Sequence, residues 1–248
     1  MSPSRPFSET APPAPFRVEV RTWPLQATAD VVETEFQLLS SDERQRADRF
    51  IYACDRADFI IARAGLRRHL GRLLHKPPEQ LAFKYTSYGR PELTELDAET
   101  ALTFNLSHSG RMAAACFTRD GIAGIDIEAI REIEHDVAGR FFSEAEQRQL
   151  ASLPSDQWLR GFFNCWTRKE AYVKALGLGI GIDLTAFDVE LNPGADPAVL
   201  RDSNDPDVTS TWRLVALPVP PTYVAALALK TNGRPLHVEC DGRIVISS

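Results

Sequence analysis

Apolar and polar positions alternate along much of the chain in short runs, and two long stretches instead follow the helical period. Residues 16–21 read F-R-V-E-V-R, which is the pattern of a half-buried strand. Helical spacing follows over about 29–39 and again over 55–74, where apolar side chains can form one stripe. Four further runs in this part of the chain predict strands: 81–85, 101–106, 111–118 and 121–128.

The second half of the chain begins with a helix signal. Ser143 and Glu146 stand in the S-x-x-E spacing of a capping box, so we predict a helix from there to about residue 152. A longer helix is expected after Pro154, ended by the glycines at 177, 179 and 181. Residues 192–209 are polar and rich in Pro, Asp and Asn, which predicts a surface excursion. Strands are predicted at 186–191, 211–217, 223–229, 236–240 and 243–246.

Strands in this order often follow strands, and each half also holds one or two helices. That order favours an α+β fold over a doubly wound parallel sheet. The first fifteen residues contain five prolines and three serines, so we expect a disordered lead-in over 1–15. The best boundary lies near 119–122, which divides the rest into an N-terminal half, 16–120, and a C-terminal half, 121–248.

Composition excludes several classes of protein. The 248 residues carry a formal net charge of −6, and the four cysteines form no C-x-x-C pair, so neither a thiolate zinc site nor a disulfide framework is indicated. No apolar run reaches the roughly 18 residues of a membrane helix, and no signal peptide is visible. The sequence therefore predicts a cytoplasmic protein that binds neither membrane nor, given its acidic balance, duplex nucleic acid.

One segment is strongly basic. Between residues 44 and 76 nine basic side chains are interrupted by three aspartates: Arg44, Arg46, Arg49, Arg56, Arg63, Arg67, Arg68, Arg72 and Lys76 against Asp48, Asp55 and Asp58. Two interpretations stay open at this point. The segment is either a solvated helix face or a clamp for a small phosphorylated ligand.

Familiar catalytic signatures are missing. The sequence has no G-x-x-x-x-G-K-[ST] loop, no H-E-x-x-H pair and no G-x-S-x-G elbow. P-loop nucleotide hydrolysis, zinc proteolysis and esterase chemistry therefore lack their residues.

Two acidic residues share one face of a predicted strand. In Gly124-Ile125-Asp126-Ile127-Glu128 the carboxylates are two positions apart, with Cα atoms about 7 Å from each other, while the isoleucines point to the core. Oxygen ligands of this kind suit Mg²⁺ that shares its shell with water and phosphate. An ordinary solvent-facing strand edge is the alternative, since D-x-E alone is a weak motif.

Two other segments supply polar chemistry. Helical spacing places Trp166, Glu170 and Lys174 on one stripe, where a surface Glu–Lys pair would not need the neighbouring Trp. Residues 104–109 read F-N-L-S-H-S, a strand running into a turn that carries hydroxyls and an imidazole. A lone histidine of this kind is as often structural as functional.

Five segments together resemble the motifs of 4'-phosphopantetheinyl transferases, in the longer surfactin-type (Sfp-like) branch. They are Tyr88-Gly89-Arg90-Pro91, residues 104–110, Gly124–Glu128, Arg140-Phe141-Phe142-Ser143 and Trp166–Leu176. The resemblance covers about residues 40–190. It implies two similar α+β halves related by a pseudo-twofold axis, with coenzyme A in the cleft between them.

The resemblance also implies the activity and its residues. The family transfers 4'-phosphopantetheine from coenzyme A to a serine of a carrier protein and releases adenosine 3',5'-bisphosphate, with Mg²⁺ as cofactor. By resemblance Asp126, Glu128 and Glu170 would hold the metal. Glu170 would take the serine proton, directly or through a water, and Lys174 would contact the phosphates. The remaining coenzyme A contacts implied are Arg90, Ser107 and His108, with Arg44, Arg49 and Arg63 as additional phosphate contacts.

The expected partners are coenzyme A and an apo acyl or peptidyl carrier protein, received near residues 129–142 by a monomeric enzyme. Phe141 or Phe142 would present an apolar contact, unless both are buried under the following helix. The alternatives are a non-catalytic protein of the same fold that binds coenzyme A or a carrier, and a Mg²⁺-dependent phosphodiesterase. The complete acidic set argues against the first. The N-L-S-H-S and K-E-x-x-x-K segments argue against the second.

Overall fold

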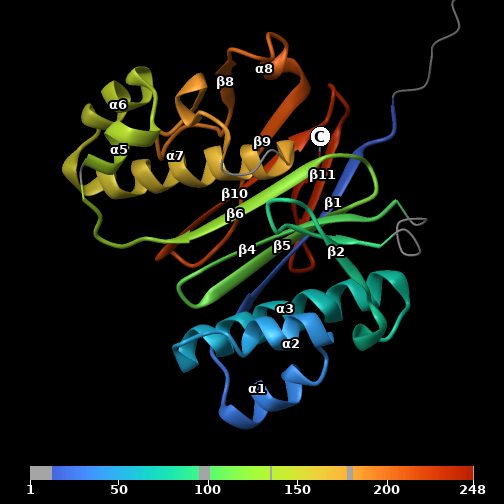
Figure 1. Cartoon of the computed structure of the whole chain (residues 1–248). Coiled ribbons are helices and arrows are strands. Elements are labelled where there is room, and N and C mark those ends of the chain that lie inside the picture. Colours follow the sequence, from blue (N-terminus) through green and yellow to red (C-terminus); the bar gives the residue numbers. More distant parts are fainter. Residues whose placement is uncertain (1–12, 95–100, 135, 178–180, 248) are drawn as a thin grey trace, which may run out of the picture.

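The structure is a computed structural model that describes residues 13–94, 101–134, 136–177 and 181–247. Helices and strands occur together in both parts of the chain, so the predicted α+β class is confirmed (Figure 1). Most of the lead-in predicted for 1–15, and Gly179 of the predicted helix end, lie outside the described residues. No helix in the described ranges is long and apolar enough to cross a membrane.

The N-terminal half runs from one strand through three helices to four more strands. In order the elements are β1 (Phe16–Pro24), α1 (Ala29–Phe36), α2 (Ser41–Ala47), α3 (Ala53–Leu74), β2 (Phe83–Tyr85), β3 (Pro91–Leu93), β4 (Thr103–Ser109) and β5 (Met112–Thr118).

The C-terminal half repeats this order with one additional short helix and then adds a hairpin. Its elements are β6 (Ala123–Ala129), α5 (Asp136–Phe141), α6 (Glu144–Ala151), α7 (Ser155–Leu176), β7 (Phe187–Val189), β8 (Val199–Asp202), α8 (Val208–Thr211), β9 (Trp212–Ala216), β10 (Tyr223–Lys230), β11 (Leu236–Cys240) and β12 (Arg243–Ser247). The long helices α3 and α7 have 22 residues each.

The two sheets have matching cores. In one, β1 pairs antiparallel with β5, and β5 with β4; in the other, β6 pairs antiparallel with β10, and β10 with β9. Each half also carries a small two-stranded sheet, β2–β3 and β7–β8. This correspondence agrees with the expected pair of similar halves.

The hairpin β11–β12 breaks the symmetry. Strand β11 runs parallel to β1 and lengthens the first sheet to the order β12-β11-β1-β5-β4. Strands from the end of the chain therefore belong to the sheet built around β1. The division at residue 120 stays a prediction.

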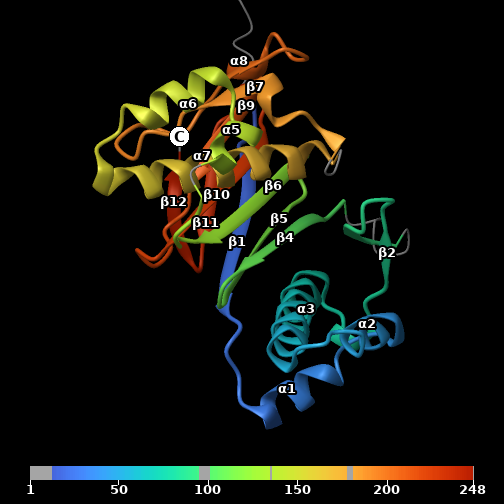
Figure 2. The ribbon, with the colours of Figure 1, turned by 60° about the vertical axis from the view of Figure 1, so that its left-hand side comes forward.

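The elements stack in four layers, with α3 on one side, the two sheets in the middle and α7 on the other side (Figures 1 and 2). A core between the sheets takes alternate residues of β1, β6 and β10, among them Val18, Ile125 and Leu227. A second core packs α7 against its sheet and a third packs α3 against β4 and β5. Alternation along each strand thus sends one face to the neighbouring sheet and the other to a helix.

Some short elements were not predicted, namely α2, α5, α8, β3 and β8. Each spans only three to seven residues, too few for a hydrophobic period to show. Helix α2 buries only Glu43 and Ala47 and therefore has no apolar stripe, although Ser40 and Glu43 form the same capping box as Ser143 and Glu146. Strand β8 lies inside the stretch predicted as a surface excursion, and it is anchored by the buried Val199.

Candidate active site at the junction of the two sheets

The site begins where the edge strand β6 meets β4. The side chain of Asn105 on β4 accepts a hydrogen bond from the backbone N–H of Ile125 at 2.9 Å, and the hydroxyl of Ser109 accepts one from the N–H of Ala129 at 3.2 Å. Side chains of β4 thus satisfy backbone groups that β6 would otherwise leave exposed at its edge. The alternating polar residues of N-L-S-H-S join the two sheets.

The same row of side chains reaches the two carboxylates of β6. Ser107 donates to Asp126 Oδ1 at 2.7 Å, and Ser109 donates to Glu128 Oε2 at 2.5 Å. Arg131 also lies 3.0 Å from Glu128 Oε2. The D-x-E pair therefore sits at the inner junction of the molecule and not on a solvent-facing strand edge.

Asp126 is the most buried member of the set, with 3 % of its surface exposed. Its Oδ1 accepts from Lys174 Nζ at 2.6 Å as well as from Ser107, whereas its Oδ2 is buried and has no hydrogen-bond partner among the described residues. Burial raises the pKa of Asp126, and the ammonium of Lys174 partly opposes that rise. A buried carboxylate oxygen without a partner is costly unless something else binds it.

A glycine lets the helix α7 approach this strand. A Cβ on Gly124 would lie 2.2 Å from the carbonyl oxygen of Ala171 and 2.4 Å from the backbone nitrogen of Ala175. Only glycine fits so close to the backbone of α7. The close packing brings Glu170 and Lys174, one turn apart on α7, to the carboxylates of β6.

Glu170 faces these carboxylates. Burial raises the pKa of Glu170, and the nearby charges of Asp126 and Glu128 raise it further, while Lys174 lowers it. The charges of Asp126 and Glu128 thus act on Glu170, and all three predicted metal ligands line one cavity.

The donor set suits a hard cation. It offers carboxylate oxygens, one of which is buried and has no hydrogen-bond partner within the described ranges. Mg²⁺ usually keeps water and substrate phosphate in its shell rather than a complete protein cage. Among the described residues, no three Asp, Glu, His or Cys side chains are arranged as a ready-made metal centre. Lys174 instead occupies Asp126 Oδ1.

The junction opens into a cavity of about 920 Å³. Both halves line it. Arg63, Arg90, Ser107 and His108 come from the first half, and the carboxylates with Lys174 come from the second. A neighbouring cavity of about 590 Å³ is lined in part by Arg46, Arg49 and Tyr85.

Arg90 links the halves across this cavity. Its Nη1 donates to the carbonyl of Lys174 at 2.8 Å and its Nη2 donates to the carbonyl of Phe104 at 3.1 Å, while Nε is buried without a partner among the described residues. Arg90 thus fixes the end of α7 against β4 and carries a positive charge on the cavity wall. Burial and the charge of Lys174 lower the pKa of the neighbouring His108.

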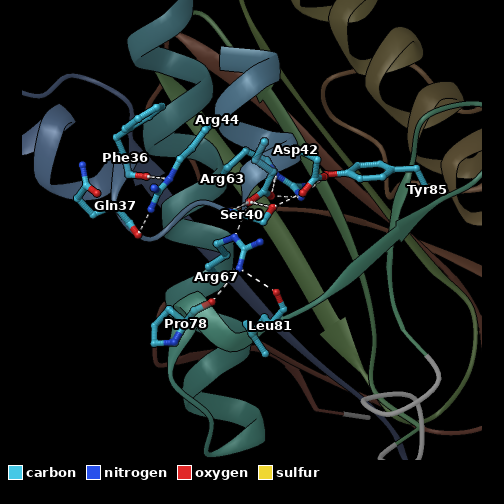
Figure 3. Close-up of polar contacts among 11 residues, drawn as sticks. Phe36, Gln37, Ser40, Asp42, Arg44, Arg63, Arg67, Pro78, Leu81 and Tyr85 are labelled. Carbon is cyan, nitrogen blue, oxygen red and sulfur yellow. Dashed lines mark hydrogen bonds and ion pairs between the residues drawn. The ribbon is translucent and has the colours of Figure 1, made fainter. Parts of the chain in front are cut away.

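The structure separates the three arginines that were expected to bind phosphate. Arg63 is buried and lines the larger cavity, and Arg49 lines the smaller one. Arg44 does not line either cavity: it donates to the carbonyls of Phe36 and Gln37 at 3.2 and 2.7 Å (Figure 3). The guanidinium of Arg44 is thus hydrogen-bonded to the end of α1 and the loop after it. A phosphate contact was expected at this side chain.

Sequence reasoning also missed or left open some cavity residues. Arg46 lines both cavities, and its place in the basic segment was the available signal. Of the two phenylalanines, Phe142 is buried, while Phe141 is 38 % exposed with its ring centroid 5.4 Å from that of Trp166. Lys169 is fully buried and lies away from the cavity, bound to Glu146 at 2.8 Å.

A cavity between two similar α+β halves, with arginines on one wall and carboxylates beside Lys174 on the other, suits an enzyme that acts on a phosphate-bearing ligand. Family models agree in both halves. The model described as 4'-phosphopantetheinyl transferase superfamily matches residues 122–228, and the one described as 4'-phosphopantetheinyl transferase, N-terminal, matches residues 22–118.

Curated relatives match over most of the chain. The 4'-phosphopantetheinyl transferase HetI of Nostoc sp. is 38 % identical over 87 % of this chain and 89 % of its own length. Psf-1 of Bacillus pumilus is 31 % identical over 81 % and 83 %, and Sfp of Bacillus subtilis is 29 % identical over 73 % and 80 %. The chain therefore belongs to the 4'-phosphopantetheinyl transferase family, in its Sfp-like type. The enzyme class predicted from the sequence is confirmed.

Proposed function

We propose that the cavity at the β4–β6 junction binds coenzyme A and that the enzyme transfers its 4'-phosphopantetheine to a serine of an apo carrier protein, releasing adenosine 3',5'-bisphosphate. The observation that carries this proposal is the buried Oδ2 of Asp126, which has no hydrogen-bond partner in the described parts of the chain and lies beside Lys174 and Glu170 at a cavity with cationic side chains on its other wall. The carboxylates of such a site can bind a metal ion, and its cationic side chains can bind phosphate oxygens. A diphosphate can then be held by the metal ion and the cationic side chains together.

Asp126, Glu128 and Glu170 are the residues that would hold Mg²⁺. When bound, the ion would neutralise part of the negative charge on the diphosphate oxygens, which increases as the leaving group departs. Without it, three carboxylates so close would repel an incoming diphosphate. Burial is the largest cause of the raised pKa values of Asp126 and Glu170, and the neighbouring negative charges add to it.

Glu170 is the group proposed to accept the proton of the carrier serine, directly or through one water. Its raised pKa makes it a better match to the hydroxyl than an exposed glutamate would be. The serine oxygen then forms a bond to the phosphorus of the phosphopantetheine arm, and the bond from that phosphorus to the oxygen of the bisphosphate breaks. Lys174, held at 2.6 Å from Asp126, contributes a positive charge beside the diphosphate.

The N-terminal half supplies further side chains that are proposed to bind coenzyme A. Arg90, Ser107, His108 and Arg63 line the same cavity as the carboxylates, and Arg49 lines the adjoining one. Arginine suits this role because its fixed fork of N–H donors matches phosphate oxygens. Arg44 is left out because it lines neither cavity.

The carrier protein is proposed to dock beside residues 129–142, next to the carboxylates. Phe141 supports this because its ring is partly exposed, lies on Trp166 and lines the cavity. Arg131 and Arg140 are exposed on the same stretch, with 58 % and 70 % of their side-chain surfaces accessible, and each is paired with an acid, Arg131 with Glu128 and Arg140 with Asp136. We propose that the enzyme acts as a monomer in the cytoplasm. Its four free cysteines fit a reducing compartment.

The direct test is a mass measurement. Purified protein with Mg²⁺ and coenzyme A is mixed with a panel of apo carrier proteins from fatty-acid, polyketide and nonribosomal peptide systems. We expect at least one carrier to gain about 340 Da, the mass of the transferred arm. A control carrier whose acceptor serine is changed to alanine should gain nothing. If no carrier gains mass although coenzyme A binds, the alternative of a non-catalytic coenzyme A-binding protein is favoured.

A further inference from the structure

Glu43 on α2 is a fully buried carboxylate bound by two arginines of α3. Arg67 Nε donates to its Oε2 at 2.6 Å, and Arg63 Nε donates to its Oε1 at 2.7 Å. The backbone N–H of Ser40 adds a third hydrogen bond at 3.0 Å. Figure 3 shows Arg63 and Arg67 converging beside Ser40. A charge so deeply buried persists only when it is paired and hydrogen-bonded.

The C-terminal half contains an equivalent of part of this cluster. Glu146 is buried, belongs to the capping box of α6 and is bound by Lys169 of α7. Lys169 and Arg67 are each the fifteenth residue of a 22-residue helix, and both are fully buried. Each also donates to two backbone carbonyls that follow its helix: Arg67 to those of Pro78 and Leu81, Lys169 to those of Leu184 and Phe187.

This repetition assigns Arg67 and Lys169 to the framework. In both halves a cation of the long helix ties the preceding short helix to the following loop. Neither Arg67 nor Lys169 lines either cavity. The pair formed by Glu43 and Arg67 is thus sufficiently explained by packing.

Arg63 has no equivalent arginine in the helix α7 of the C-terminal half. It is the eleventh residue of α3, and the eleventh residue of α7 is the buried Cys165. Unlike Arg67, Arg63 lines the larger cavity. Its Nη2 is bound by Glu43 and, at 3.2 Å, by the hydroxyl of Tyr85, while Nη1 has no hydrogen-bond partner among the described residues. The ring of Phe83 stacks on the guanidinium, with its centroid 4.9 Å from Arg63 Cζ.

We propose that Glu43 is a positioning residue for substrate binding: it holds Arg63 by Nε and Nη2 so that Nη1 is presented to a phosphate group of coenzyme A in the cavity. This inference rests on the proposed function, because it takes coenzyme A as the ligand. Glu43 itself does not touch the cavity. It acts by fixing one guanidinium in advance, which lowers the cost of ordering that side chain when the ligand binds.

The test is a double-mutant cycle on the affinity for coenzyme A, measured by titration calorimetry on the full chain. Glu43→Gln keeps the shape of the side chain and removes its charge. We expect Glu43→Gln and Arg63→Gln each to weaken coenzyme A binding about tenfold, as for loss of one charge-assisted hydrogen bond. The double variant should be no weaker than Arg63→Gln alone, because Glu43 acts through Arg63.

Glu146→Gln is the matched control, since it removes the equivalent buried carboxylate of the other half. It should lower the unfolding midpoint as Glu43→Gln does, and it should leave the coenzyme A affinity of the folded protein unchanged. If Glu43→Gln does not fold, Glu43→Gln combined with Arg67→Met removes the cation that would be left unpaired. That protein should fold and still show the weakened affinity.

Unchanged affinity in the folded Glu43 variants, or losses at Glu43 and Arg63 that simply add, would overturn the inference. The wild type separates this failure from a failure of the proposed function. Wild-type protein that transfers the arm to a carrier, together with an unchanged Glu43→Gln affinity, contradicts only the positioning role. Wild-type protein that neither binds coenzyme A nor transfers contradicts both.

Discussion

The two halves of the molecule share a framework and differ in chemistry. Each has a strand, short helices with an S-x-x-E capping box, a 22-residue helix and a three-stranded antiparallel sheet core. Each buries the capping-box glutamate against the fifteenth residue of its long helix. These shared contacts are buried pairs within each half, so they account for the fold and not for the site.

A second shared pair shows how the halves diverge. The twentieth residue of α7, Lys174, is bound to the fourth residue of β6, Asp126. The twentieth residue of α3, Arg72, is bound to the fourth residue of β1, Glu19. The first pair lies at the cavity and is the less exposed of the two: 4 % of the Asp126 side chain and 28 % of the Lys174 side chain are accessible, against 23 % for Glu19 and 54 % for Arg72.

The environment of the strand edges explains this difference. Strand β6 is an edge strand, and its free side meets the polar side chains of β4. The corresponding side of β1 is paired with β11. The terminal hairpin thus closes one junction and leaves the other open to ligand. The same helix–strand ion pair becomes part of a site only where the neighbouring strand edge is unpaired.

The largest expected effect comes from removing the acids at the open junction. Asp126→Asn should lower transfer activity by roughly 10³-fold or more, because it removes a proposed metal ligand from a charged site. Glu170→Gln should lower it by roughly 10²–10⁴-fold through loss of the proposed base. Steady-state rates of carrier modification measure both.

Glu19→Gln is the control for Asp126→Asn, because it removes the equivalent carboxylate of the other half. It should retain wild-type turnover and change stability by about 1 kcal/mol, as expected for a partly exposed carboxylate that pairs with Arg72 and Arg21. Equal losses at Glu19 and Asp126 would show that the two pairs are equivalent in function, and the proposed divergence of the halves would then be wrong.

An intermediate effect is expected from the close approach of α7 to β6. Gly124→Ala places a Cβ against the backbone of Ala171, so the helix must shift at a cost of about 1–3 kcal/mol. A displacement of about 1 Å at Glu170 and Lys174 is enough to lower turnover about 10²-fold. Chemical denaturation and steady-state rates measure the two effects.

Gly139→Ala in α5 is the control for Gly124 in the stability measurement alone, because Gly139 lies in the proposed carrier-docking stretch 129–142. A Cβ at Gly139 meets no atom within 4 Å. The substitution also removes a helix-interior glycine, so the stability should stay the same or rise slightly. Wild-type stability and turnover in Gly124→Ala would contradict the proposed role of the close contact.

The smallest expected effect is a difference in pH sensitivity between the long helices. His69 is the seventeenth residue of α3, and its ring lies 5.3 Å from that of Trp23; the seventeenth residue of α7 is Ala171, which does not titrate. Burial, with a further contribution from Arg72, lowers the pKa of His69 below 6.5. The unfolded chain therefore binds the proton more readily.

The contribution of neutral His69 to the free energy of unfolding is therefore complete above pH 6.5. This contribution is lost as the pH falls from 6.5 through the lower pKa of His69 in the folded state. His69→Phe keeps an aromatic ring beside Trp23 and should flatten the dependence of Tm on pH between about 5 and 7. Thermal unfolding followed over that range measures it. An unaltered slope would show that another group is responsible.

Sequence alone predicted the parts of the site that follow from periodicity. Alternation on one strand placed Asp126 and Glu128 on one face and the isoleucines in the core, and helical spacing placed Glu170 with Lys174. It could not predict which cations are buried in ion pairs. Arg63 and Arg67 meet Glu43 across 20 and 24 residues of sequence, and that contact depends on how α2 packs against α3.

The central claim is that carboxylates of one half and cations of the other meet on the diphosphate of coenzyme A. Crystals grown with coenzyme A and Mn²⁺ in place of Mg²⁺ test it most directly, through an anomalous difference map. We predict one peak that contacts Asp126, Glu128, Glu170 and the diphosphate, with Arg63 and Arg90 on the ligand from the opposite wall. A manganese peak away from these carboxylates, or a diphosphate bound outside the β4–β6 junction, would contradict the claim.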